Sequence, residues 1–99
     1  MNIVKNQTGA NLTIALEGRL DTVTAPQLEN ELHTSLDGVK ELVFDLKDLS
    51  YISSAGLRVL LSAQKIMNKQ GDMSIRNVCP AVMEIFEVTG FVDILNIEE

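Results

Sequence analysis

Apolar and polar residues alternate with two different periods along the chain, and the change of period separates short strands from longer helices. A period of two predicts a strand over residues 12–16 that ends at Gly18. A weaker alternation predicts an edge strand over residues 1–7, and the turn residues 8–11 join the two segments. The first two strands are therefore predicted to form a β-hairpin.

A four-residue apolar period then predicts the first helix. Thr24 opens it, because Thr24 and Gln27 have the spacing of a capping box and Pro26 stands in the first turn, where its missing N–H does no harm. Asp37 and Gly38 end the helix. Its predicted buried stripe consists of Leu28, Leu32 and Leu36.

The middle of the chain predicts a strand and a long helix. The strand covers residues 39–46, and its continuous apolar run at 42–44 is typical of a strand covered on both faces. Residues 49–52 are expected to lead out of that strand. The helix is predicted over residues 54–70, followed by Gly71, the residue type preferred just past a helix end. Its predicted core-facing residues are Leu57, Leu60, Leu61 and Met67.

The last part of the chain repeats the same order. A strand is predicted over residues 73–76, a third helix over 80–89 with Gly90 as its stop, and a closing strand over 91–97, directly or after a short turn. The apolar side of the third helix consists of Val82, Ile85 and Phe86. Strands that alternate with helices imply right-handed crossovers and parallel pairing beyond the hairpin. We therefore predict one α/β domain over residues 1–99, with a mixed, mostly parallel sheet of four to five strands and three or more helices.

Composition narrows the classes of partner and chemistry. The formal net charge is −6, with 8 Lys and Arg against 14 Asp and Glu, which argues against DNA, RNA or an anionic membrane as the main partner. One Cys and one His exclude an internal disulfide, a thiolate zinc cluster and a His-rich metal site. No secretory signal and no membrane-length apolar run is visible. We expect a cytoplasmic domain with no cofactor, no metal, no nucleic-acid partner and no membrane insertion.

Two adjacent serines, Ser53 and Ser54, stand where a strand exit becomes a helix start. Unpaired N–H groups and the helix dipole favour negative charge at such a start, so a phosphate on a serine there would be held without melting the helix. Gly56 adds no side chain beside the hydroxyl, and we expect this to let another protein approach closely. From the physics alone, an ordinary helix N-cap is the commoner explanation of such a serine.

Several motifs together resemble a known family. Residues 53–57 (SSAGL), preceded by 48–52 (DLSYI), resemble the signature of STAS domains, and are most similar to the small bacterial anti-sigma factor antagonists. Residues 18–21 (GRLD), 80–82 (PAV) and 85–90 (IFEVTG) resemble further family motifs in the same order and spacing. The resemblance covers nearly the whole chain.

The resemblance implies partner switching in the control of sigma-factor-dependent transcription. In that family, the unmodified antagonist binds an anti-sigma factor serine kinase, which frees the sigma factor. The kinase phosphorylates the antagonist, which ends the complex, and a metal-dependent serine phosphatase resets it. The phosphorylated serine lies two residues before the motif glycine, which implies Ser54 here. Many members have Asp where this chain has Ser53, so Ser53 is the alternative acceptor. The protein is then a phosphoprotein that works by protein binding, and not an enzyme.

We expect this switch to act through charge at a small partner surface. Asp21 matches a family position near that surface, and Ser54 is expected at the rim of an apolar patch built from Leu20, Val23, Tyr51 and Ile52. Burial of a phosphate in the contact would break the complex while the fold survives. The residues expected to bind the partner are Leu20, Asp21, Val23, Tyr51, Ile52, Ser53, Ala55, Gly56 and Arg58.

Other functions remain open at this point. A non-phosphorylated STAS scaffold subunit of a signalling or transport assembly is the main alternative. A serine hydrolase is less favoured, because its G-x-S-x-G turn would need Gly at position 52, and His33 has no pattern of triad partners. Asp45 and Asp48 are explained better as solvated turn residues than as a metal pair.

Overall fold

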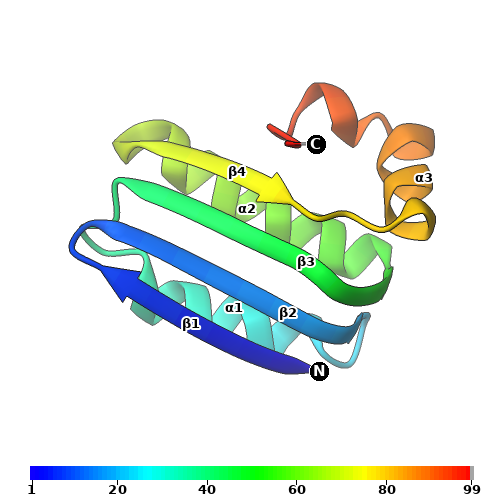
Figure 1. The fold of residues 1–99 in the computed structure, drawn as a ribbon, viewed down its shortest axis with the longest axis horizontal. Coiled ribbons are helices and arrows are strands. Elements are labelled where there is room, and N and C mark those ends of the chain that lie inside the picture. The colour runs from blue at the N-terminus through cyan, green and yellow to red at the C-terminus, as the bar shows by residue number, and fades with distance from the viewer. Residues whose placement is uncertain (99) are drawn as a thin grey trace.

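Four strands form one mixed sheet whose spatial order, β1-β2-β3-β4, is also their order along the chain (Figure 1). A computed structural model describes residues 1–98. Strands β1 (Asn2–Thr8) and β2 (Asn11–Leu20) pair antiparallel, and β3 (Glu41–Ile52) and β4 (Asp72–Arg76) continue the sheet in parallel. The predicted α/β class, the hairpin and the parallel pairing beyond it are confirmed.

Two of the three α-helices cover the same face of this sheet. Helices α1 (Ala25–Ser35) and α2 (Ser54–Gln70) lie behind the strands in Figure 1, and α3 (Pro80–Thr89) lies beyond the carboxyl end of β4. Because β2, β3 and β4 run in the same direction, the loops that lead into α1 and α2 meet at one end of the sheet.

The closing strand predicted over residues 91–97 is wrong in extent. Phe91–Asp93 form a short 3-10 helix, η1, and Ile97 alone pairs with Ile75 of β4 through a single parallel bridge. The cause lies at Gly90, whose φ of +80° ends α3 in the left-handed region and starts η1, so the chain curls before it reaches the sheet.

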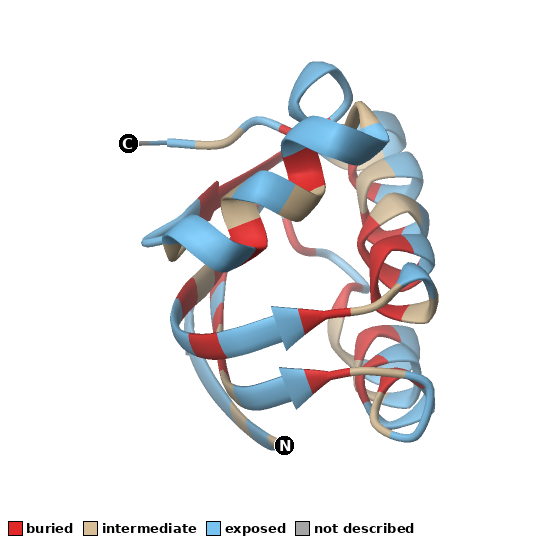
Figure 2. Cartoon of the chain, turned by 90° about the vertical axis from the view of Figure 1, so that its right-hand side faces the viewer, coloured by how far each residue is buried: buried red, intermediate tan, exposed pale blue. Residues whose placement is uncertain are grey.

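Most buried residues lie where the sheet and the α1–α2 layer face each other (Figure 2), and Val82 and Phe86 of α3 belong to the same core cluster. The predicted stripe of α1 and the apolar run at residues 42–44 are buried. The prediction for Leu61 of α2 is wrong, since it is only half-buried while Val59 and Ala63 are buried. At 3.6 residues per turn, the buried stripe of α2 is centred on Leu60 and Ala63, and Leu61 falls at its margin.

Strands β2 and β3 are longer than predicted, and their extra length positions the serines. β2 continues through Gly18 to Leu20, and residues 49–52 are the last part of β3 rather than an exit from it. Gly18 has φ +103° and lies at a register shift between the two strands, so it bends β2 without ending it. As a result, the strands end side by side at Leu20 and Ile52, immediately before the loops into α1 and α2.

Candidate functional site

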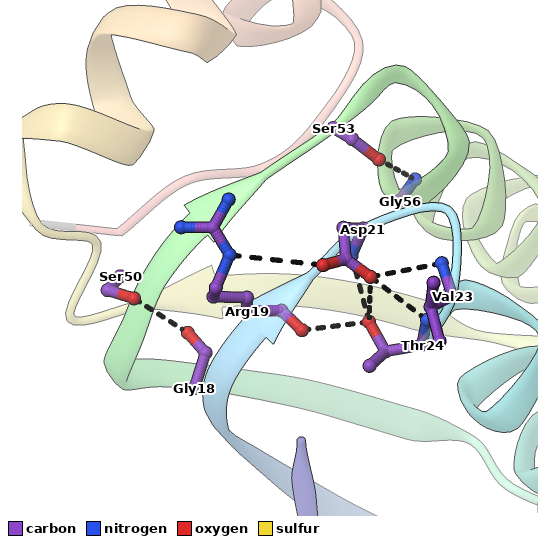
Figure 3. Close-up of polar contacts among 8 residues, drawn as sticks. All are labelled: Gly18, Arg19, Asp21, Val23, Thr24, Ser50, Ser53 and Gly56. Atoms are coloured by element: carbon purple, nitrogen blue, oxygen red, sulfur yellow. Dashed lines mark hydrogen bonds and ion pairs between the residues drawn. The ribbon is translucent and has the colours of Figure 1, made fainter.

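The two serines at the start of α2 have different environments. Ser53 is the N-cap with extended backbone, and its half-buried hydroxyl accepts a hydrogen bond from the Gly56 N–H at 3.4 Å (Figure 3). Ser54 is the first residue of the helix and is exposed. Within residues 1–98, no side-chain hydrogen bond engages the Ser54 hydroxyl, so this oxygen is the more accessible of the two.

Gly56 is required by packing on the inner side of α2. It is buried, and a methyl group at this position would lie 2.7 Å from Cγ of Leu20 and 2.9 Å from Cγ1 of Ile52. The expectation that Gly56 opens space for another protein beside the hydroxyl is therefore wrong, because the space it saves faces the core.

The apolar patch expected beside Ser54 is smaller than predicted. Leu20 and Ile52 belong to the core, with 0% and 1% of their surface exposed, because both strand ends turn these side chains toward the helices. Neither can therefore form a surface patch. Of the four residues predicted to form the patch, the exposed ones are Val23, with 85% of its surface exposed, and Tyr51, with 36%.

A hydrogen-bonded turn leads into α1 (Figure 3). Oδ1 of Asp21 accepts the N–H groups of Val23 at 3.0 Å and Thr24 at 3.1 Å. The Thr24 hydroxyl accepts the Asp21 N–H at 2.8 Å, and its proton lies within donating distance of both the Arg19 carbonyl, at 2.8 Å, and Oδ1 of Asp21, at 3.1 Å. The capping box predicted between Thr24 and Gln27 is wrong, because this turn already uses the Thr24 hydroxyl.

These contacts lower the pKa of Asp21 below its ordinary value. The backbone N–H of Thr24 contributes most, and the Thr24 hydroxyl, the Val23 N–H and the Arg19 guanidinium act in the same direction, against the opposing effect of desolvation. Asp21 is therefore ionised at neutral pH and holds the turn closed. Its predicted contact with a partner stays a prediction.

Arg19 joins this turn to the end of β3. Its guanidinium carbon lies 4.3 Å from the centre of the Tyr51 ring, a cation–π distance, and its Nε lies 3.8 Å from Oδ2 of Asp21. The register of β2 and β3 makes Arg19 and Tyr51 direct neighbours across the strands. Sequence reasoning noted Arg19 only as part of a family-like motif and did not single it out, because its pairing with Tyr51 depends on strand register.

An open hollow of about 410 Å³ lies between the first turns of α1 and α2. It brings half-buried Ala55 and exposed Arg58, both expected at the partner surface, next to the start of α1. The hollow is lined by Thr22, Ala25, Pro26, Glu29, Ala55, Arg58, Val59 and Ser62.

Other chemically competent side chains are placed apart from Ser54. His33 lies in the last turn of α1 and lines a hollow with residues 59–66 of α2, not with the start of that helix. Asp45 accepts the Lys47 N–H and the Asn77 side-chain amide at 3.1 and 3.0 Å. In the part of the chain that the structure describes, no three His, Cys, Asp or Glu side chains cluster as metal ligands would. Nor does any described helix have the length and apolar character needed to span a membrane.

Comparison with known proteins decides the family. The sequence model of the STAS domain matches residues 2–99, nearly the entire chain. The chain belongs to the STAS domain family. The exposed serine at the start of α2 and the Asp21 turn described above thus lie in a member of this family.

Relatives of this STAS domain include two regulatory proteins of known name. BtrV of Bordetella bronchiseptica, a candidate anti-sigma factor antagonist, is 40% identical over 96 residues, which cover 95% of this chain and 83% of BtrV. The anti-sigma-B factor antagonist of Bacillus subtilis is 30% identical over 98 residues, which cover 98% of this chain and 90% of that protein.

A solved structure has the same fold. The Bacillus cell fate determinant SpoIIAA in its phosphorylated form matches with a TM-score of 0.76 and 19% identity, over 99% of this chain and 92% of that one. The match supports the arrangement of a mixed sheet with helices on one face as the STAS fold.

Proposed function

We propose that this STAS domain is an anti-sigma factor antagonist that binds an anti-sigma factor serine kinase when unmodified and is released when Ser54 is phosphorylated. The exposed hydroxyl of Ser54 at the start of α2 carries the proposal. The names of BtrV and of the Bacillus subtilis relative support it, as does the existence of SpoIIAA in a phosphorylated form. The protein acts by binding and not as an enzyme, in the cytoplasm, where the kinase has ATP.

The switch works because a phosphate is tolerated by the free domain and rejected by the complex. Phosphorylation adds about −1.5 to −2 charges at neutral pH. In the free domain, the positive end of the α2 dipole stabilises that charge by roughly 0.3–1 kcal/mol. In a contact packed over Ser54, burial of the same charge costs several kcal/mol, and each ~1.4 kcal/mol lowers the affinity tenfold. The complex therefore dissociates while the fold persists, and a metal-dependent serine phosphatase restores the binding form.

The environment of the two serines favours Ser54 over Ser53 as the acceptor. The Ser53 hydroxyl is half-buried and holds the Gly56 N–H, so phosphate transfer to it would require loss of the helix cap. Transfer to Ser54 breaks no side-chain hydrogen bond within residues 1–98. Val23 and Tyr51 are the exposed apolar residues available to pack against the kinase in the unmodified state.

The proposal is tested by phosphate mapping. The wild-type protein, Ser54→Ala and Ser53→Ala are each incubated with Mg-ATP and with the purified anti-sigma serine kinases of the same genome, and phosphate is located by intact-mass and peptide analysis. We expect one phosphate on Ser54 in the wild type and in Ser53→Ala, and none in Ser54→Ala. A wild-type protein that binds a kinase yet stays unmodified contradicts the switch and favours a non-phosphorylated scaffold.

A further inference from the structure

Arg19 presents unused hydrogen-bond donors at the end of β2, which pairs with the end of β3 that leads into the proposed phosphorylation site. Its side chain is 61% exposed, and only its Nε faces the Asp21 carboxylate, at a long 3.8 Å. The two terminal nitrogens point away from Asp21 (Figure 3), and within residues 1–98 no acceptor is bonded to them. The outer edge of the guanidinium is therefore open to an external group.

Two contacts restrict the position of this guanidinium. The Tyr51 ring supports it from below at 4.3 Å, and the Asp21 carboxylate that faces its Nε is itself fixed by the N–H groups of Val23 and Thr24. An arginine that is already positioned loses less side-chain entropy on binding than a free one. Exposed Arg and Tyr side chains packed together are the residue types that dominate the energetics of protein interfaces.

We propose that Arg19 is a specificity-determining contact of the unmodified domain and that it binds a carboxylate of the anti-sigma factor kinase. The inference rests on the proposed function. The planar fork of a guanidinium matches the two oxygens of a carboxylate, with two parallel hydrogen bonds. Because the chain carries a net charge of −6, long-range attraction favours a basic partner surface, and one acidic group paired with Arg19 fixes how that partner docks.

The same contact links phosphorylation to release. Arg19 is stacked on Tyr51, and the strand ends that carry these two residues are paired. Ser54 lies three residues after Tyr51 along the chain. A phosphate on Ser54 would have the same sign as the kinase carboxylate, so it would repel that carboxylate and compete for the Arg19 fork. Tyr51 and Asp21 act as positioning residues for Arg19 in this arrangement.

The test is a titration with the purified anti-sigma factor kinase that binds the unmodified wild type. Arg19→Gln is expected to weaken binding about tenfold without a change in melting temperature. Arg76→Gln is the matched control, because Arg76 also has an exposed side chain and an Nε ion pair, to Glu98 at 3.2 Å. This variant is expected to bind like the wild type. Arg19→Lys, which keeps the charge and loses the fork, should fall between Arg19→Gln and the wild type.

The positioning role of Tyr51 is tested by repeating Arg19→Gln in a Tyr51→Leu background. We expect a smaller effect there, since the guanidinium is no longer held, whereas independent roles would leave the two effects additive. Arg19→Gln that binds as tightly as the wild type overturns the inference and leaves the proposed function intact. A wild type that binds none of the kinases overturns both. If Arg19→Gln leaves kinase binding unchanged and lowers only the melting temperature of the phosphorylated protein, the guanidinium binds phosphoserine and not a kinase carboxylate. The inference is then wrong.

Discussion

Helices α1 and α2 begin next to each other at one end of the sheet, yet different groups close their first turns. Before α1, the charged carboxylate of Asp21 accepts two backbone N–H groups, at 3.0 and 3.1 Å. At α2, the neutral hydroxyl of Ser53 accepts one, at 3.4 Å, and Ser54 beside it is exposed. Both starts carry the positive end of a helix dipole, but only the first is compensated by a charge. The uncompensated start of α2 is therefore the one at which we propose phosphorylation.

The largest effect is expected at the end of β2, which leads into the start of α1. Leu20→Ala should lower the free energy of unfolding by about 3 kcal/mol, because it leaves a cavity under both starts. Val23→Ala, in the exposed loop that follows, should change it by less than about 0.5 kcal/mol. Urea unfolding measures both, and equal stabilities of the two variants would contradict the core position of Leu20.

The next largest effect is expected from a charge added at the start of α2. Ser54→Asp should weaken kinase binding about a hundredfold, and Ser54→Ala should bind like the wild type, because only a buried charge opposes docking. Both variants should unfold within about 1 kcal/mol of the wild type. Partner titration and urea unfolding supply the two readouts. Tight binding by both variants would count against a charge switch.

The packing beneath the second start is probed by Gly56→Ala. The new methyl group meets Leu20 and Ile52, which costs about 1–3 kcal/mol, and the better helix propensity of Ala returns about 1 kcal/mol. A net loss of about 1 kcal/mol is expected in urea unfolding. Ser62→Ala, on the exposed side of the same helix, is the control. A more stable Gly56→Ala variant would show that the core yields easily at this point.

Ser53→Ala tests the N-cap of α2. It should lower the free energy of unfolding by about 1 kcal/mol, because the hydrogen bond from the Gly56 N–H is lost. Ser54→Ala should leave the free energy of unfolding nearly unchanged, because the exposed Ser54 hydroxyl is not the cap. If Ser54→Ala proves the more destabilising of the two by urea unfolding, the assignment of cap and free hydroxyl is reversed.

The charge at the first start gives a pH dependence. The pKa of Asp21 is lowered by folding, so its stabilising contribution is present above the ordinary value of about 3.9 and is lost as the pH falls through the lowered pKa. Asp21→Asn removes this contribution. We expect the variant to be less stable than the wild type at pH 7 and the difference to shrink below about pH 4. Urea unfolding across this pH range measures the difference in free energy of unfolding between the two proteins. A difference that stays constant with pH would contradict a stabilising role for the ionised Asp21 carboxylate.

The ends of the second and third helices were predicted correctly, and three of these four ends are marked by a residue whose effect is local. Ser53 caps α2 and Pro80 starts α3, while Gly90 ends α3 in the left-handed region. The serine motif likewise predicted where an exposed hydroxyl would lie. Gly71 follows α2 as predicted, but its φ of 177° is extended, and it is required because any Cβ would collide with the carbonyl of Lys40.

By itself, the sequence determined the order of elements as far as α3, the α/β class, the three α-helices and the position of Ser54, since hydrophobic period and end signals act over a few residues. The tertiary structure decided that Leu20 and Ile52 are core residues and that Arg19 stacks on Tyr51. These outcomes depend on two register shifts between β2 and β3. A shift of one residue exchanges the two faces of a strand, and the register is set by contacts between strands that lie far apart along the chain.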